Sequence, residues 1–291
     1  MMKRILAPTD LSANSKPGLI FAMQLAQKNN ATLEFIYVHQ FMRPVSWSDD
    51  YFDRHKMAQT KVNREALARF VERVSVDARM PLGRHAHVVE EGIRPDVTIM
   101  LHCQRHPDID YICMSTRGAG KLDQVLGTNT GNLIAKSDIP VVAVPKNYSI
   151  RPIDHLLYAS DLDNYDMELK AVLKFAHPLA AEVEVLHINF ADLLAPTREM
   201  IESTFAGQFK YGLKLHFENG SPKSSLVKIL KQQLNAIKPA MVIMFAKQGR
   251  SVIERLFQPG NTENLSFDLN IPLLALNKVQ KAGRKYTQRS N

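Results

Sequence analysis

Several features that mark other protein classes are missing from this sequence. Only two cysteines, Cys103 and Cys113, occur in 291 residues, and they lack the Cys-x-x-Cys spacing of zinc and thiol redox sites. We therefore expect both to be reduced core or near-surface residues. Gly-x-Ser-x-Gly and His-Glu-x-x-His motifs are also absent, so hydrolase chemistry of those types has no support.

Long apolar runs are missing as well. None approaches the roughly 18 residues that a membrane-spanning helix needs. The basic start at Lys3 and Arg4 precedes too short an apolar stretch for a secretory signal. We therefore expect a cytoplasmic protein with no membrane partner. With 45% hydrophobic and 23% charged residues, the chain has enough apolar material for a core in each of two domains.

The formal charge of +8 raises the question of a nucleic-acid partner. Much of the excess lies in a polar C-terminal tail, and no stretch interleaves basic with aromatic residues as an RNA-binding sheet would. We therefore interpret the tail as solvated and expect no nucleic-acid partner. Its basic residues are Lys278, Lys281, Arg284, Lys285 and Arg289.

An internal repeat organises the chain. Residues 129–146 recur 132 positions later, so that Asn129-Thr130 matches Asn261-Thr262 and Ile139-Pro140 matches Ile271-Pro272. The starts of the two halves also match. There Ile5-Leu6, Asp10-Leu11 and Leu33-Glu34 correspond to Leu156-Leu157, Asp161-Leu162 and Val183-Glu184. We therefore predict one domain at 1–147, a second at 151–279 and a polar basic tail at 280–291.

Short apolar runs alternate with longer segments of helical period in each half, which is typical of a parallel sheet with crossover helices. The sequence thus predicts an α/β fold of two tandem doubly wound domains, each a five-stranded parallel sheet with helices on both faces. The predicted strands are 4–8, 33–38, 86–89, 111–114 and 141–144 in the first half, and 156–159, 183–188, 213–217, 241–245 and 273–276 in the second.

A glycine-bearing loop follows the fourth predicted strand. It contains Gly118, Gly120 and Gly127, and a helical segment begins after it, where Thr128 or Thr130 would act as a cap. Glycines let the backbone approach an anion, and a helix N-terminus attracts phosphate. The loop is not a P-loop, because Leu122 stands where Ser or Thr would hold magnesium. Nor is it a dinucleotide fingerprint, because Asp123 occupies the third glycine position.

The segment from Met114 to Thr128, with the strand Val141–Val144 behind it, resembles the signature of the universal stress protein family. The opening run Ile5–Ser12 is similar to the family's first strand and acidic turn. The resemblance covers nearly all of residues 2–147 and, more weakly, 151–279. It implies a Rossmann-like fold of the adenine nucleotide alpha hydrolase type and ATP binding, with or without Mg2+.

The resemblance also implies which residues bind the nucleotide. The loop would hold the phosphates, Asp10 would lie near the nucleoside, and the backbone at Val38 would lie at the adenine. The full predicted set is Ala7, Pro8, Thr9, Asp10, Val38, Ser115, Gly118, Gly120, Gly127, Thr128 and Asn129. We expect no catalytic residue and no tightly bound metal, although slow ATP hydrolysis assisted by Asp10 stays an alternative.

Two departures from the family pattern support a second interpretation. Ser115 replaces the first glycine, and eight residues instead of nine separate Gly118 from Gly127. The alternative function is a protein-interaction module that binds no nucleotide and keeps a relic of the loop. In the second half Phe245 and Gln248 stand at the first two glycine positions, so we predict no ATP there and a structural role.

Three further expectations concern contacts. The last strands of the halves, 141–144 and 273–276, are predicted to pair with each other in an intramolecular pseudo-dimer, with homodimerisation through other faces as an addition. His102 and His106 fall in the last turn of a helix, where a metal site is less expected than an interaction with the helix dipole. Trp47 is expected to pack over the domain edge.

Overall fold

The computed structural model describes residues 2–116, 128–162, 164–189, 199, 202–203, 213–220, 226–246 and 270–277. Its strands are β1 Arg4–Thr9, β2 Thr32–His39, β3 His85–Glu91, β4 Ile109–Ser115, β5 Val141–Val144, β6 His155–Ser160, β7 Glu182–Asn189, β8 Leu213–Asn219, β9 Met241–Ala246 and β10 Leu273–Asn277. All ten predicted strands are confirmed, and the observed strands extend one or two residues further at most of their ends.

Helices connect these strands. They are η1 Ala13–Ser15, α1 Lys16–Asn29, α2 Asp49–Asp77, α3 Pro95–Arg105 and α4 Thr128–Lys136 in the first half, and α5 Tyr165–Ala176, η2 His177–Leu179 and α7 Leu226–Ile237 in the second. Local sequence explains several boundaries. Proline stands in the first turn of α1 and of α3, where its missing N–H costs nothing. Helix α1 ends at Asn30, which has the left-handed φ of 51°.

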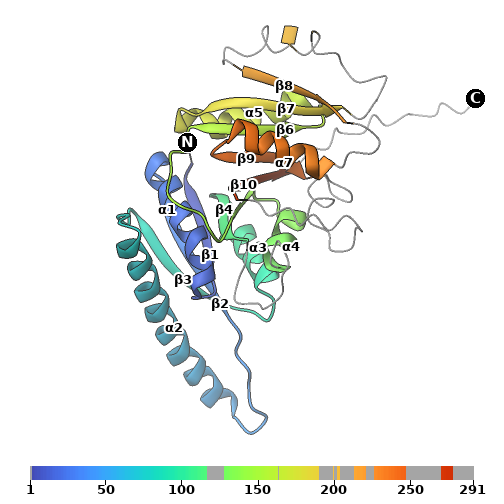
Figure 1. The fold of residues 1–291 in the computed structure, drawn as a ribbon. Coiled ribbons are helices and arrows are strands. Elements are labelled where there is room, and N and C mark those ends of the chain that lie inside the picture. Colours follow the sequence, from blue (N-terminus) through green and yellow to red (C-terminus); the bar gives the residue numbers. More distant parts are fainter. Residues whose placement is uncertain are drawn as a thin grey trace, which may run out of the picture.

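The strands form one ten-stranded sheet in the order β3-β2-β1-β4-β5-β10-β9-β6-β7-β8 (Figure 1). The two halves therefore have the same strand order, read outward in opposite directions from the centre. Pairing is parallel within each half, and β5 pairs antiparallel with β10, with Val142 opposite Leu274. The fold is the predicted α/β class, whereas the domain boundaries at 147 and 151 stay a prediction.

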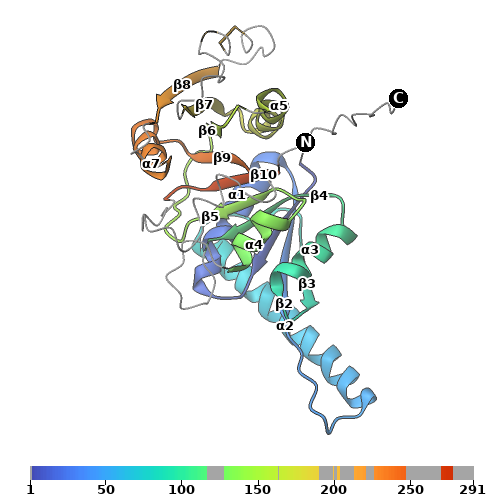
Figure 2. The same ribbon diagram turned by 90° about the vertical axis from the view of Figure 1, so that its right-hand side faces the viewer.

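Helices cover both faces of the sheet, and each face has its own core (Figure 2). One core packs α1, α2 and α5 against residues such as Phe35 and Val185. The other packs α3, α4 and α7 against residues such as Ile36 and Leu157. Both cores run through both halves of the chain, because the sheet is continuous across the β5–β10 pair.

Side-chain contacts also join the halves beside the central strands. Asn277 donates a hydrogen bond from Nδ2 to the carbonyl of Ser137 at 2.6 Å. The rings of Tyr111 and Phe175 meet edge to face, with centroids 5.4 Å apart. The cysteines belong to this interior: both are free and buried as predicted, and burial raises the pKa of the Cys103 thiol to about 12.

One close approach sets the position of α1. A Cβ atom at Gly18 would lie 2.5 Å from the backbone nitrogen of Ser115 and 2.7 Å from the carbonyl carbon of Met114. Only glycine lets the helix pack this near the end of β4. Within the part of the chain that is described, no helix has both the length and the apolar character to cross a membrane.

We predict that Gly18→Ala lowers the free energy of unfolding by about 2–3 kcal/mol, because the added methyl group displaces α1 from β4. The measurement is urea unfolding followed by circular dichroism. Gly131→Ala in α4 is the matched control, since a Cβ there meets no atom within 4 Å. It should raise stability by about 0.5–1 kcal/mol. Equal effects of the two substitutions would contradict the proposed packing constraint.

Candidate functional site

The candidate site lies at the carboxyl edge of the sheet in the first half. Strands β1 and β4 are parallel neighbours and end at Thr9 and Ser115. Helix α4 begins beside them at Thr128, as Thr130 donates a hydrogen bond to the Ser115 carbonyl at 2.9 Å. The chain runs outward from β1 to β2 on one side and from β4 to β5 on the other. This is the topological switch point where doubly wound sheets bind ligands.

Hydroxyl groups tie the loops of this edge together. Thr9 Oγ1 accepts a hydrogen bond from the N–H of Leu11 at 3.0 Å and lies 2.7 Å from Ser15 Oγ. Ser15 in turn donates to the carbonyl of Ser12 at 2.8 Å. These bonds hold the turn after β1 in one conformation, in which Leu11 has a left-handed φ of 60°. The turn therefore presents Asp10 at a defined position.

The Asp10 side chain is exposed and shapes the same turn. Its Oδ1 accepts hydrogen bonds from Ser12 N at 3.0 Å and from Ser12 Oγ at 2.6 Å. The interpretation of Asp10 as a turn former is thus confirmed. The carboxylate lies at the surface of the site.

The remaining predicted residues of β1 and β2 form the floor and side of this edge. Ala7, Pro8 and Thr9 are buried, so that side chains of β1 support the site from below. Val38 is half-buried near the end of β2, on the face that packs against α3. The small Ala7 is the feature that differs most from the second half.

Ser115 is engaged within the fold. Its hydroxyl accepts a hydrogen bond from the N–H of Gly18 at 2.9 Å and donates to the carbonyl of Ser15 at 3.1 Å. A phosphate contact from this hydroxyl would have to replace one of these bonds. The serine therefore secures the start of α1 against β4. This structural role could not be predicted from the sequence, in which Ser115 only replaces a glycine of the family pattern.

The predicted phosphate contacts divide into two groups. Thr128 and Asn129 are the first residues of α4, and both are exposed. The first N–H groups of such a helix have no partner within the helix and favour anions. Gly118, Gly120 and Gly127 lie outside the described residues, so their part in the site rests on the sequence.

The equivalent edge of the second half has the same turn. The N–H of Leu162 donates to Ser160 Oγ at 3.0 Å, and Leu162 has a φ of 65°. The hydrogen-bond distance and the φ angle match those of Leu11 and Thr9 in the first half. This match agrees with the repeat in the sequence. The backbone of the turn is therefore shared by the two halves.

The side chains at this second edge are different. Tyr158 stands at the position of Ala7, and Phe245 stands at that of Ser115. Both aromatic side chains are buried, and their rings meet edge to face with centroids 5.7 Å apart. Tyr158 also donates a hydrogen bond to Glu168 of α5. Two buried aromatic rings thus stand where the first half has the small side chains of Ala7 and Ser115.

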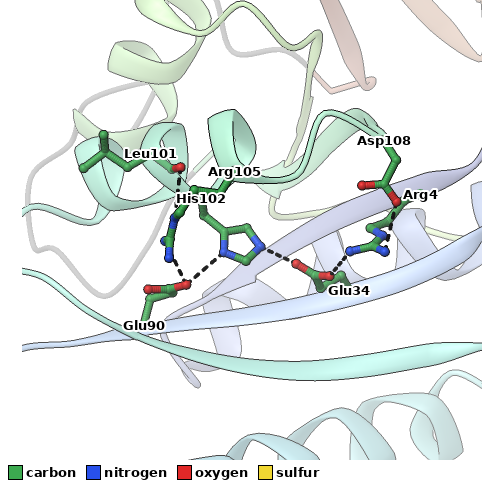
Figure 3. A network of polar contacts seen from close by, with 7 residues as sticks. All are labelled: Arg4, Glu34, Glu90, Leu101, His102, Arg105 and Asp108. Carbon is green, nitrogen blue, oxygen red and sulfur yellow. Dashed lines mark hydrogen bonds and ion pairs between the residues drawn. The ribbon is translucent and has the colours of Figure 1, made fainter.

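A charged network that no motif in the sequence indicated lies between α3 and the sheet (Figure 3). His102 is almost fully buried, and its two ring nitrogens face Glu34 of β2 and Glu90 of β3. The distance from Nδ1 to Glu90 Oε1 is 2.9 Å. His102 lies in the last turn of α3 as predicted, but strands distant in sequence also supply two carboxylates, which the helix position did not indicate.

Arginines complete this network at its two ends. Arg4 of β1 lies 2.8 Å from Glu34 and 2.9 Å from Asp108, and Arg105 lies 2.9 Å from Glu90. The buried Glu34 and the half-buried Glu90 therefore each have a basic side chain on two sides, which offsets the cost of desolvation. Among the described residues, no group of three His, Cys, Asp or Glu side chains has the arrangement of a metal site.

The contacts move the pKa values of this network in opposite directions. Burial disfavours the charged form of His102, but hydrogen bonds and charge attraction from Glu34 and Glu90 outweigh it and raise the pKa of the imidazole. Burial similarly opposes ionisation of both glutamates, but their contacts with His102 lower the pKa of each carboxyl. The contacts therefore favour the charged imidazolium form of His102 and the ionised form of both glutamates.

The second half keeps a reduced form of this arrangement. Glu184 of β7 corresponds to Glu34, and His155 of β6 corresponds to Arg4. His155 Nε2 and Lys214 Nζ each lie 3.2 Å from Glu184 Oε1, and His216 also contacts this carboxylate. A glutamate with basic neighbours on adjacent strands is therefore common to both halves, whereas the buried histidine from a helix belongs to the first.

The fold and the candidate site define a doubly wound α/β protein with two similar halves, whose carboxyl edges differ in their buried side chains. The family model described as the universal stress protein family matches residues 1–145. The chain belongs to this family through that first half.

Comparisons with individual proteins also find universal stress proteins. Universal stress protein A homolog 1 of Coxiella burnetii is 26% identical over 149 residues, which are 49% of this chain and 95% of that protein. A universal stress protein from Archaeoglobus fulgidus has the same fold, with a TM-score of 0.68 at 19% identity. The match covers 95% of this chain and 99% of that one. A protein of unknown function from Pseudomonas aeruginosa PAO1 gives a TM-score of 0.59 at 16% identity, over 95% and 92%. The fold of these two solved chains thus extends over both halves.

The buried network predicts a specific dependence of stability on pH. Because the pKa of His102 is raised above its ordinary 6.5, its contribution is complete below pH 6.5 and is lost as the pH rises through the folded-state value. The contributions of Glu34 and Glu90, whose pKa values are lowered from 4.5, are complete above pH 4.5. They are lost when acid takes the pH through the folded-state values.

We therefore predict that His102→Gln removes about 3 kcal/mol of stability near pH 6, because it leaves two carboxylates without their shared cation. The difference from the parent protein should narrow as the pH rises above 6.5. Urea unfolding across this range measures both quantities. Parallel stability curves for the two proteins would show that the imidazole does not carry the charge.

Proposed function

We propose that the chain is a stress-response protein that binds an adenine nucleotide at the carboxyl edge of its first half. The observation that carries the proposal is the difference between two equivalent edges of one fold. The first edge has the small residues Ala7 and Ser115 where the second has Tyr158 and Phe245, whose buried rings pack against each other. The second half then has a structural role, and it stabilises the first through the shared sheet.

The residues of the first edge fit an adenine nucleotide. The exposed start of α4 at Thr128 and Asn129 offers N–H groups to phosphate. Asp10 offers an exposed carboxylate, which would accept hydrogen bonds from ribose hydroxyls. Val38 contributes an apolar side chain and nearby backbone for the base. Gly118, Gly120 and Gly127 would complete the phosphate contacts, with or without Mg2+.

The proposal assigns no chemical step to the protein. Asp10 is already used by Ser12 in the turn, which favours a positioning role over that of a general base. We accordingly infer that the protein senses or stores nucleotide in the cytoplasm without turning it over. The pairing of β5 with β10 supports an intramolecular pseudo-dimer of the two halves.

A second candidate function is a protein-interaction module that binds no nucleotide. It is favoured by Ser115, whose hydroxyl is occupied by Gly18 and Ser15, and by the shortened loop. Titration calorimetry of the nucleotide-stripped protein with ATP and magnesium separates the two functions. One site per chain supports nucleotide binding, and the absence of heat with no co-purifying nucleotide supports the interaction module.

We predict that Gly127→Asp weakens ATP binding by about 100-fold or more, equivalent to about 2.7 kcal/mol, because it places charge and bulk against the phosphates. Gly260→Asp, in the corresponding loop of the second half, is the control and should leave the affinity unchanged. Calorimetry of both variants provides the comparison. An equal loss of ATP affinity in both variants would exclude the hypothesis that only the first half binds nucleotide.

Asp10→Asn tests the nucleoside side of the site separately. Asparagine keeps the acceptor that Ser12 uses in the turn but removes the charge, so we expect about tenfold weaker binding, or about 1.4 kcal/mol. Asp161→Asn makes the same change in the second half and should have no effect. Unchanged affinity in Asp10→Asn would remove this carboxylate from the proposed site.

A further inference from the structure

A projecting arm distinguishes the first half from a simple doubly wound domain. Residues 40–62, here called the α2 arm, comprise the segment after β2 and the first half of α2. None of them is buried, and the buried residues of α2 begin at Asn63. Both views show this part of the chain extending away from the sheet (Figures 1 and 2). The arm therefore stands clear of the body that covers the rest of α2.

Apolar side chains are concentrated on the arm. Ten large hydrophobic residues are exposed among the described residues, and five of them lie within the α2 arm. Their exposed fractions include 80% for Met42, 105% for Val45 and 74% for Met57. Such a concentration on 23 residues is typical of an interaction surface, because scattered single residues are the norm elsewhere.

Local contacts give the arm a defined structure. Ser48 caps α2 by accepting a hydrogen bond from the N–H of Tyr51 at 3.3 Å. Trp47 packs edge to face on Tyr51 and His55, with ring centroids 4.7 and 4.8 Å apart. Trp47 thus packs on the start of its own helix, so its expected packing over the domain edge was wrong. The arm is consequently a shaped element that a partner can contact.

A symmetric pattern of charge runs along the helical part of the α2 arm and continues to Arg64, two residues beyond it. Asp50, Asp53, Met57, Lys61 and Arg64 are all exposed and are separated by 3, 4, 4 and 3 residues. Positions three and four apart share one helix face, so the five form a single stripe. The spacing of these five residues is a palindrome about Met57. Their charge is negative before Met57 and positive after it, and the exposed Arg54 lies beside the acidic pair on the same face.

The four charged side chains of the stripe have no ion pair with any other described residue. Each also has a like-charged neighbour three positions away, Asp50 with Asp53 and Lys61 with Arg64. Such pairs destabilise an isolated helix by a few tenths of a kcal/mol. The helix dipole stabilises the acidic pair, which lies near the N-terminus of α2. It does not stabilise the basic pair, which lies in the middle of the helix.

We propose that the stripe pairs with the same stripe of a second copy of this chain, with the two α2 helices antiparallel about a two-fold axis at Met57. This arrangement places Asp53 opposite Lys61 of the second copy and Asp50 opposite Arg64. The two-fold axis generates each of these ion pairs twice, and the exposed Met57 side chains of the two copies meet on the axis. A different partner would not need the palindromic spacing, whereas a self-complementary surface requires it.

The dimer is expected to be weak and sensitive to salt. Stable dimers bury about 1,200–2,000 Å2 in total, and five residues of one helix face cover less. The contacts between exposed charges are screened at high ionic strength. The pairing therefore depends on protein concentration and adds no subunit contact through the ten-stranded sheet.

Sedimentation velocity over a concentration series is the test. The parent protein should form dimers at about 0.02 M salt and dissociate at about 0.5 M, where the screening length falls to a few ångströms. Asp53→Lys and Lys61→Asp should each remain monomeric at low salt, because each puts like charges opposite one another. The double variant D53K/K61D should dimerise again, since the charges are exchanged within each pair. An equimolar mixture of the two single variants should also show dimers, through matched charges.

Val76→Asp is the control, since Val76 is an exposed apolar residue of α2 outside the stripe. It should dimerise as the parent does, and circular dichroism should show that every variant is folded. A parent protein that stays monomeric at low salt overturns the proposal and assigns the arm to a different partner. A dimer that survives both single charge reversals overturns it too, because another surface then holds the copies together.

Discussion

The antiparallel pairing of β5 with β10 is the contact on which the architecture depends. It joins two five-stranded sheets of equal order into one and carries both cores across the junction. Without it, Val142 and Leu274 would each lie on an exposed strand edge, which is a site for unwanted pairing. Because the junction uses the last strand of each half, the carboxyl edge at the first strand of each half stays outside it.

The two halves show how one backbone supports different side-chain environments. The turns after β1 and β6 share a left-handed leucine and a hydroxyl that accepts its N–H. The packing behind those turns has diverged, since Tyr158 and Phe245 fill the second edge. The two carboxyl edges of one fold therefore differ, with aromatic side chains in the second half and small ones in the first. This asymmetry connects the family membership to the proposed nucleotide site.

The network around His102 and the stripe on α2 both consist of charged side chains, but the first is largely buried and the second is exposed. His102 is held between Glu34 and Glu90 in the interior, where each ion is paired and the cost of desolvation is offset. The stripe around Met57 leaves its charges in water and without intrachain ion pairs among the described residues. Buried charges of this kind position α3 on the sheet, whereas exposed ones are available to a second molecule.

Much of the fold could be predicted from the sequence, because its signals are local. All ten strands follow from short apolar runs, and the common strand order agrees with a repeat that matches Asp10-Leu11 to Asp161-Leu162. The position of Phe245 in the second half likewise indicated a filled edge, since a bulky ring at a glycine position needs no structure to interpret.

Tertiary structure decided what depends on residues far apart in the chain. The role of Ser115 was visible only when Gly18 placed α1 against it, and the charge of His102 depends on two strands that are 68 and 12 residues distant. Residue spacing along one element determines which side chains share a face. Which groups meet across elements, and therefore which pKa values shift, is determined only when the sheet and its helices pack together.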